Sequence, residues 1–319
     1  MKRFALMILL MSALLLIASA QKKNSENPAS KELLKIPVWV EDGEDKFWDK
    51  GDPRSFKIFI DDKEAPLKSF QGPRNSTILL VVFDTVASLS RVDLARAELI
   101  EAVKGLPENY WIGLLRAQDE LSVIQEPTPN RESLVKKIQA VPVAGKAGLL
   151  DTLEPVSRLG AEILHKAGVR LCVLYVTDSA IGHYRADYLN PVINSSDSGD
   201  LSRRFPDRVV QERMSPLAES LGKFTIPVFI LHLEYRSDAV NLAYQSGLER
   251  IAAGSGGSAL FCRTDTDIKP ALDKLFARIR SVYFLGIDAP AVKRQQFKIR
   301  IEAQTAEAPV GRVNYAGQK

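Results

Sequence analysis

Cysteine and histidine are scarce: the 319 residues include two cysteines and three histidines. Two cysteines exclude a disulfide scaffold and a cysteine-rich zinc module. No histidine pair has HExxH or HxH spacing, so a histidine-based zinc centre is not expected. Neither sign of charge prevails, because the net charge is only +4. This balance gives no electrostatic reason to expect nucleic-acid binding.

The N-terminal residues have the pattern of a secretory signal peptide. Lys2 and Arg3 precede an apolar run over residues 4–17, and Ala18-Ser19-Ala20 fits a small-x-small cleavage site. We therefore predict a signal peptide over residues 1–20 and a secreted or periplasmic protein. An uncleaved membrane anchor is the alternative, which the shortness of the run disfavours. We expect no other contact with a membrane.

Hydrophobic periodicity divides the remaining chain into segments. A polar linker is predicted at 21–35, and an N-terminal β segment at 36–75 with strands at 36–40, 55–60 and 67–70. Residues 76–282 then alternate between two kinds of element. The expected strands are 77–83, 111–115, 121–124, 169–176, 226–233 and 259–262, and the expected helices are 92–103, 132–140, 149–164, 209–221, 239–253 and 268–282.

This alternation predicts an α/β fold with a doubly wound, mainly parallel sheet covered by helices on both faces. Two further strands are expected in the C-terminal segment 283–319, at 283–287 and 296–303. We expect them to pack with the N-terminal β segment, so that both chain ends form one small β appendage. Ligands of doubly wound folds bind at the carboxyl ends of the strands.

Acidic residues follow two of the apolar strands at that edge. Asp84 ends the strand 77–83 and is followed by hydroxyl residues, and Asp178 follows the strand 169–176. Adjacent strands would bring the two carboxylates together. Carboxylate and hydroxyl oxygens are suited to Mg²⁺ or Ca²⁺.

Four segments, in their order along the chain, carry a family resemblance. They are DTVAS (84–88), GKAGLLDTL (145–153), YVTDS (175–179) and AGSGGSALF (253–261). In these the chain resembles secreted bacterial proteins related to the von Willebrand factor type A (VWFA) domain. Such domains have a Rossmann-like fold and bind partner proteins through a metal-ion-dependent adhesion site.

The resemblance implies a degenerate metal site. Asp84, Ser88 and Asp178 match the family motif, whereas Val86 and Ala147 stand where the family has a serine and a threonine. Two of the five expected ligand groups are therefore lost, so at most weak Mg²⁺ binding is expected and no other cofactor. A structural role for the two acids, which would satisfy backbone donors in loops, is the favoured interpretation.

Other reactive residues have simple structural interpretations. Ser255 lies between a helix and a strand, the reverse of the order that a nucleophile elbow requires, and so is expected in a helix C-terminal turn. In the strand order that the resemblance implies, another strand separates those of Cys172 and Cys262, which places the two thiols too far apart for a disulfide. His232 is expected in the core or at a strand end.

The segment 181–206 is long for a loop and leaves the strand that ends at Asp178. Two interpretations remain open: a solvated insertion, or a partner surface built from residue types common at interfaces. The candidates for that surface are Tyr184, Arg185, Tyr188, Arg203, Arg204 and Phe205.

These observations favour an exported, non-enzymatic module that binds an unidentified protein partner without a metal. A metal-dependent adhesion module that uses Asp84, Ser88 and Asp178 is the alternative. A hydrolase is disfavoured, because no nucleophile–base pair and no phosphate-binding loop occurs.

Overall fold

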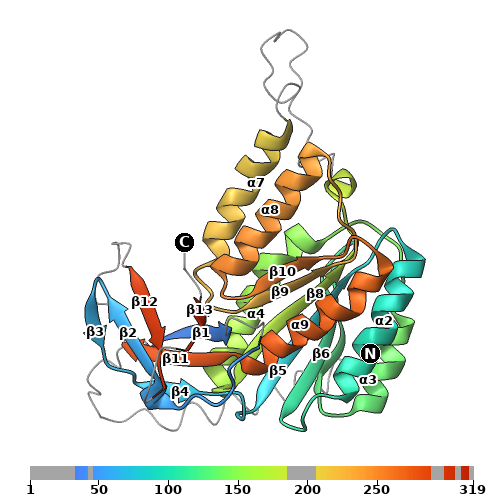
Figure 1. Cartoon of the computed structure of the whole chain (residues 1–319). Coiled ribbons are helices and arrows are strands. Elements are labelled where there is room, and N and C mark those ends of the chain that lie inside the picture. The colour runs from blue at the N-terminus through green and yellow to red at the C-terminus, as the bar shows by residue number, and fades with distance from the viewer. Residues whose placement is uncertain (1–32, 42–45, 185–205, 289–297, 306–309, 316–319) are drawn as a thin grey trace, which may run out of the picture. The chain divides into compact units, whose positions relative to one another are not determined.

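A six-stranded sheet organises most of the chain (Figure 1). The computed structural model describes residues 33–41, 46–184, 206–288, 298–305 and 310–315, all within the unit Leu33–Lys319. The strand order is β10-β9-β8-β5-β6-β7, and only β7 runs antiparallel to its neighbour. The strands are β5 (Thr77–Asp84), β6 (Tyr110–Arg116), β7 (Ser122–Thr128), β8 (Arg170–Thr177), β9 (Val228–His232) and β10 (Ser258–Phe261).

Uninterrupted apolar runs explain why β5, β8 and β9 lie in the middle of this sheet. Every residue of β8 and β9 is buried, as is every residue of β5 except Ile78. Strands of this kind are stable only where helices cover both faces of a sheet. The predicted α/β fold with a mainly parallel sheet is therefore confirmed.

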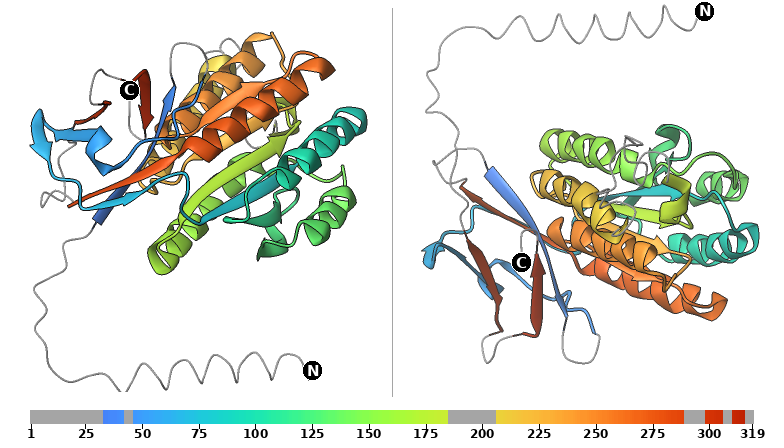
Figure 2. Two further views of the ribbon diagram at one scale, coloured as in Figure 1. Left: turned by 60° about the horizontal axis from the view of Figure 1, so that its bottom comes forward. Right: turned by 90° about the horizontal axis from the view of Figure 1, so that it is seen from above.

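Two groups of three helices lie on opposite faces of the sheet (Figure 2). Within each group one helix contacts the other two. The first group is α2 (Leu89–Lys104), α3 (Arg131–Ala140) and α9 (Ile268–Ser281), and the second is α4 (Leu149–Ala167), α7 (Pro206–Leu221) and α8 (Ala239–Gly254).

Local sequence signals fix the ends of several of these helices. The side chains of Asn130 and Asp238 cap α3 and α8 by accepting hydrogen bonds from backbone N–H groups three residues further on. Helix α4 ends at Gly168, whose φ of +62° is a left-handed conformation that glycine adopts without strain. Short 3₁₀ turns occur at Pro53–Ser55, Ile181–Tyr184 and Asp265–Asp267.

Both chain ends contribute to a second, all-β part, which we call the terminal β unit. One antiparallel sheet has the order β13-β1-β11-β4, and the other has the order β12-β2-β3. The strands are β1 (Leu33–Glu41), β2 (Phe56–Ile60), β3 (Lys63–Ala65), β4 (Ser69–Gln71), β11 (Tyr283–Asp288), β12 (Ile299–Ala303) and β13 (Arg312–Tyr315). The predicted β appendage from both chain ends is therefore confirmed.

A separate apolar cluster stabilises the terminal β unit. It includes Ile36, Phe56, Tyr283 and Ile301, which come from four different strands. The rings of Phe56 and Tyr283 lie 4.9 Å apart between centroids. Residues distant in the sequence thus share one small core.

Some predicted boundaries need correction. The linker expected at 21–35 overlaps β1, because Leu33 to Lys35 already pair with strand β11. The short strand β3 begins at Lys63, between two of the expected strands. The fourth strand of the terminal β unit covers Ser69–Gln71 instead of 67–70. The signal peptide predicted at 1–20 lies outside the described residues.

Candidate functional site

The parallel pairing of β5 and β8 brings the two predicted acids together. Asp84, the last residue of β5, pairs with Thr177, and the Asp178 backbone N–H donates to the Asp84 carbonyl oxygen at 3.3 Å. Both acids are almost fully buried. The expected juxtaposition at the carboxyl edge of the sheet is therefore present.

Asp178 holds the loop that leads into α2. Its carboxylate accepts backbone hydrogen bonds from Val86 at 2.7 Å, Ala87 at 2.9 Å and Ser88 at 2.6 Å. Ser88 is the N-cap residue of α2, but its own side chain makes no capping hydrogen bond. Asp178 thus supplies the negative charge that stabilises the start of this helix. This is the structural role predicted from the sequence.

Asp84 is hydrogen-bonded on both carboxylate oxygens. Oδ1 accepts from the backbone N–H of Gly148 at 2.8 Å, and Oδ2 accepts from the Thr177 hydroxyl at 3.0 Å and the Tyr184 hydroxyl at 3.4 Å. Burial raises the pKa of Asp84 above its usual value, although the hydrogen bonds from Gly148 and Thr177 act in the opposite direction. Hydrogen-bond donors of the same chain therefore surround the Asp84 carboxylate.

Gly148 is required where it donates to Asp84. A Cβ atom at this position would lie 1.8 Å from the carbonyl oxygen of Ala117, so any other residue would displace the backbone. Gly148 directly follows Ala147, which stands where the family has a threonine. Its N–H faces Asp84.

Tyr184 closes this edge of the sheet. Besides its contact with Asp84, its hydroxyl oxygen accepts the Leu149 backbone N–H at 3.1 Å and lies 3.2 Å from the hydroxyl of Ser179. The 3₁₀ turn Ile181–Tyr184 directs the ring inward, and the residue is buried. Burial raises the pKa of Tyr184 well above its usual value. The phenol therefore serves as a neutral hydrogen-bonding group.

A network of buried polar groups continues from Ser179. Its hydroxyl lies 2.8 Å from that of Thr177 and 3.4 Å from that of Tyr244, while its carbonyl oxygen lies 2.9 Å from Nε2 of His232. The Nδ1 atom of His232 accepts the backbone N–H of Glu234 at 3.2 Å. Burial lowers the pKa of His232 to about 4, so the ring is neutral at pH 7 and donates through Nε2.

The donor set at this edge does not fit a hard cation. Mg²⁺ needs near-ideal octahedral oxygen coordination. Val86 and Ala147 offer no side-chain oxygen, both oxygens of Asp178 already accept backbone hydrogen bonds, and the Tyr184 hydroxyl lies against Asp84. In the part of the chain that the structure describes, no cluster of three or more His, Cys, Asp or Glu residues could hold a metal ion.

The predicted partner surface needs one correction. Tyr184 is buried in the polar network, so it is not part of an exposed surface. The other five candidates lie outside the described residues: Arg185, Tyr188, Arg203, Arg204 and Phe205. Sequence inspection missed the inward position of Tyr184, although Ile181 and Tyr184 are apolar or aromatic residues three apart, the spacing of one 3₁₀ turn.

Ser255 and the two cysteines have structural positions. Ser255 follows the end of α8, where its hydroxyl donates to the Ala252 carbonyl oxygen at 2.7 Å and accepts the Val228 backbone N–H at 2.9 Å. Cys172 and Cys262 are buried free thiols. Cys172 lies on β8 and Cys262 directly follows β10, and β9 separates these two strands as predicted. Within the described ranges, no helix is long and apolar enough to cross a membrane.

An exposed leucine lies beside the polar network. Leu89, the first residue of α2, follows Ser88 directly and has 60% of its surface exposed. The loop before it is held by Asp178. This edge therefore presents an apolar side chain at the start of a helix whose preceding loop is held in place.

Comparison with solved structures finds similar folds at low sequence identity. The PilB minor pilin from Streptococcus sanguinis is 17% identical over 68% of this chain and 62% of its own, with a TM-score of 0.44. The vWF domain of the type V pili tip protein Mfa5 from Porphyromonas gingivalis is 13% identical over 64% of this chain and 94% of its own, also with a TM-score of 0.44. Solved vWF domains are thus among the folds that this chain resembles.

A third similar structure is proximal thread matrix protein 1 from the mussel byssus. It is 13% identical over 63% of this chain, with a TM-score of 0.41. The match spans 47% of that protein and 62% of the pilin, so this chain covers less than two thirds of each. No family model matches the chain, and no curated protein is significantly similar to it.

Proposed function

We propose that the chain is an exported, non-enzymatic protein-binding module of VWFA type whose carboxyl edge binds its partner without a metal. One observation carries this proposal: six donors of the chain satisfy the carboxylates of Asp84 and Asp178, which would otherwise face a cation. A partner would contact the exposed surface around Leu89. The binding energy would then come from apolar and hydrogen-bonding contacts.

Metal independence is testable by thermal unfolding with EDTA, Mg²⁺ or Mn²⁺. A bound ion stabilises the folded state by mass action, by about 1.4 kcal/mol when its concentration is ten times the Kd. We expect no cation-dependent shift in the wild-type Tm. A clear rise would support the alternative, a metal-dependent adhesion module that uses Asp84, Ser88 and Asp178.

A triple variant provides the positive control. Val86→Ser and Ala147→Thr restore the two missing hydroxyls, and Tyr184→Phe removes the hydroxyl that contacts Asp84. We expect Mg²⁺ to raise the Tm of the triple variant. If it does not, the family motif has been aligned with the wrong residues.

Partner binding is testable with a matched pair of variants. Tagged wild-type protein, Leu89→Asp and Leu94→Asp would be incubated with the exported proteins of the native host, in EDTA and in Mg²⁺. Leu94 is on the same helix and is 45% exposed, so it controls for a new surface charge. We expect a partner that the wild type and Leu94→Asp retain in both buffers and Leu89→Asp loses.

Two results would contradict the binding proposal. Retention by all three proteins would exclude the Leu89 surface, and retention only in Mg²⁺ would restore the metal-dependent alternative.

Export itself is testable by mass spectrometry of the native protein, which should find an N-terminus near Gln21. An intact Met1 in a membrane fraction would support the anchor instead.

A further inference from the structure

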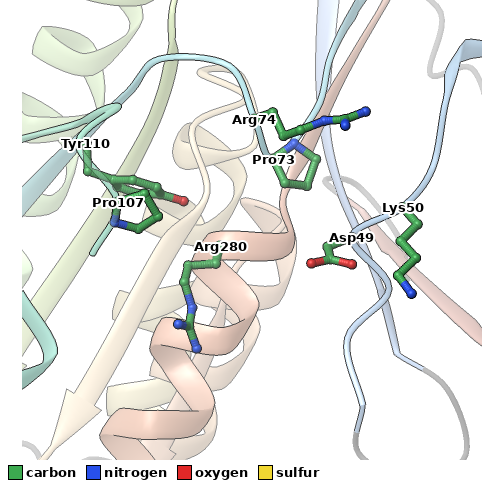
Figure 3. A pocket seen from close by; sticks show the side chains of 7 residues that line it. All are labelled: Asp49, Lys50, Pro73, Arg74, Pro107, Tyr110 and Arg280. Atoms are coloured by element: carbon green, nitrogen blue, oxygen red, sulfur yellow. The ribbon is translucent and has the colours of Figure 1, made fainter. Parts of the chain in front are cut away.

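A cationic pocket lies at the opposite edge of the six-stranded sheet, where β5 and β6 begin. Its volume is about 500 Å³, within the range of ligand-binding pockets. Pro73, Pro107 and Tyr110 form its apolar wall. Figure 3 shows Tyr110 and Pro107 on one side of this pocket and Asp49 on the other, with Arg280 between them.

Four charged side chains complete the lining, and three of them are positive. Lys50 comes from the segment before the first 3₁₀ turn, Arg74 from the turn before β5, and Arg280 from the last turn of α9. Asp49 is the acid. None of the four forms an ion pair or a hydrogen bond with another residue in the described ranges. Their charges are therefore available to a ligand.

A fifth charge is buried behind the wall. Arg170, the first residue of β8, is fully buried, and its guanidinium donates to the Pro73 carbonyl oxygen at 3.0 Å and to the Tyr110 hydroxyl at 3.2 Å. No described carboxylate forms an ion pair with it, and its Nε has no hydrogen-bond partner among the described residues. A buried cation without a counter-charge is costly, so this wall favours an anion in the pocket.

We propose that this pocket binds an acidic peptide segment of a partner protein. The positive side chains come from three separate segments and are exposed, so they are spaced to meet several carboxylates along a chain. A single phosphate group would instead be held by donors that converge on one point. The proline and tyrosine wall suits the methylene groups of glutamate side chains.

The pocket site is separate from the Leu89 surface and extends the proposed function to a second region. Its location at the amino ends of β5 and β6 places it away from Asp84 and Asp178, which lie at the carboxyl ends. Leu89→Asp is therefore expected to bind an acidic peptide as the wild type does. This expectation distinguishes failure of one proposal from failure of the other.

The test is a titration of the full chain with a fluorescein-labelled hexaglutamate peptide, followed by fluorescence anisotropy. We expect saturable binding that the double variant Arg74→Glu/Arg280→Glu weakens by about tenfold or more, because each reversal converts attraction into repulsion. The matched control is Lys63→Glu/Lys136→Glu, which reverses two exposed lysines outside the pocket. It should change the affinity by less than about twofold, because exposed charges far apart are screened.

Asp49→Asn provides a further test, because a folding defect would not produce the tighter binding that is expected of this variant. Removing the one acid of the lining should tighten hexaglutamate binding about threefold, because a like charge near the ligand is lost. A hexaglutamine peptide should not bind. Equal weakening by the control variant, displacement of the peptide by an equal concentration of inorganic phosphate, or absence of binding would each overturn the proposal.

Discussion

The charged side chains at the two edges of the six-stranded sheet differ in whether other groups of the chain pair with them. At the carboxyl edge, Asp84 and Asp178 are buried and hydrogen-bonded by groups of the same chain. At the amino edge, Arg74 and Arg280 line a pocket without partners among the described residues. At the first edge the chain itself pairs the charged groups, whereas at the second edge no described residue pairs with them.

This contrast separates the position of a charged residue from the interactions that it makes. The acids at the carboxyl edge occupy the place where the family resemblance implies a metal, yet their interactions are those of caps and loop anchors. The pocket has no counterpart among the quoted family segments, yet it offers unpaired cations in front of a buried Arg170. A satisfied polar network indicates stability, whereas unsatisfied charges around a cavity indicate recognition.

The largest effect is expected where Asp178 holds the start of α2. Asp178→Ala leaves the backbone N–H groups of Val86, Ala87 and Ser88 without their acceptor, and we expect it to lower the free energy of unfolding by about 4 kcal/mol. Urea unfolding measures this change. Ser88→Ala, whose hydroxyl caps nothing, is the control and should cost under about 1 kcal/mol. Equal losses in the two variants would contradict the anchoring role of Asp178.

Acid pH should lower the free energy of unfolding through His232, which lies at the same edge of the sheet. Its pKa is about 4 in the folded protein against 6.5 ordinarily, so between these values the unfolded chain binds a proton that the folded protein does not. Stability is fully present above pH 6.5 and falls as the pH decreases to 4, by about 3 kcal/mol.

His232→Gln isolates this contribution, because glutamine does not titrate. Asp84 acts with the opposite sign: its raised pKa stabilises the fold at low pH, and that stabilisation is lost as the pH rises through the folded pKa. The difference between wild type and His232→Gln, followed by urea unfolding from pH 7 to pH 4, cancels the Asp84 contribution. A difference that does not change with pH would contradict the neutral buried ring.

Tyr184→Phe should have a smaller effect. It removes the hydroxyl that accepts the Leu149 N–H and contacts Asp84, so we expect a loss of about 2 kcal/mol in urea unfolding. The matched control is Tyr235→Phe, on a half-buried tyrosine whose hydroxyl makes no hydrogen bond to another described residue. If the two variants are equally stable, Tyr184 does not close this edge.

The smallest change in stability is expected at the pocket. Arg74→Glu/Arg280→Glu should alter the free energy of unfolding by less than about 0.5 kcal/mol, because exposed side chains without partners contribute little. Thermal unfolding checks this value. A loss as large as that of Asp178→Ala would mean that the pocket charges are structural, and the contrast between the two edges would disappear.

The sequence was sufficient to predict the central sheet and the meeting of the two acids. Apolar runs identify β5 and β8, and parallel neighbours end at the same edge, so Asp84 and Asp178 had to lie close together. The family resemblance also singled out Ser88, Val86 and Ala147. These are local patterns whose consequences are fixed by sheet geometry.

The sequence was insufficient where contacts depend on tertiary packing. Tyr184 follows a buried strand by only seven residues, but its inward direction depends on the 3₁₀ turn and on the groups that its hydroxyl meets. The pocket joins Lys50, Arg74 and Arg280, which no spacing rule relates. Only the pairing of the chain ends brings these segments near one another.

The pairing of β1 has a consequence for the order of folding. This strand, the first of the described residues, lies between β11 and β13, which are synthesised only after every strand of the six-stranded sheet. Its backbone donors and acceptors have no strand partner until then, and the closure of so long a loop is entropically unfavourable and slow. The terminal β unit must therefore assemble late, around a central sheet whose own strands can already have paired.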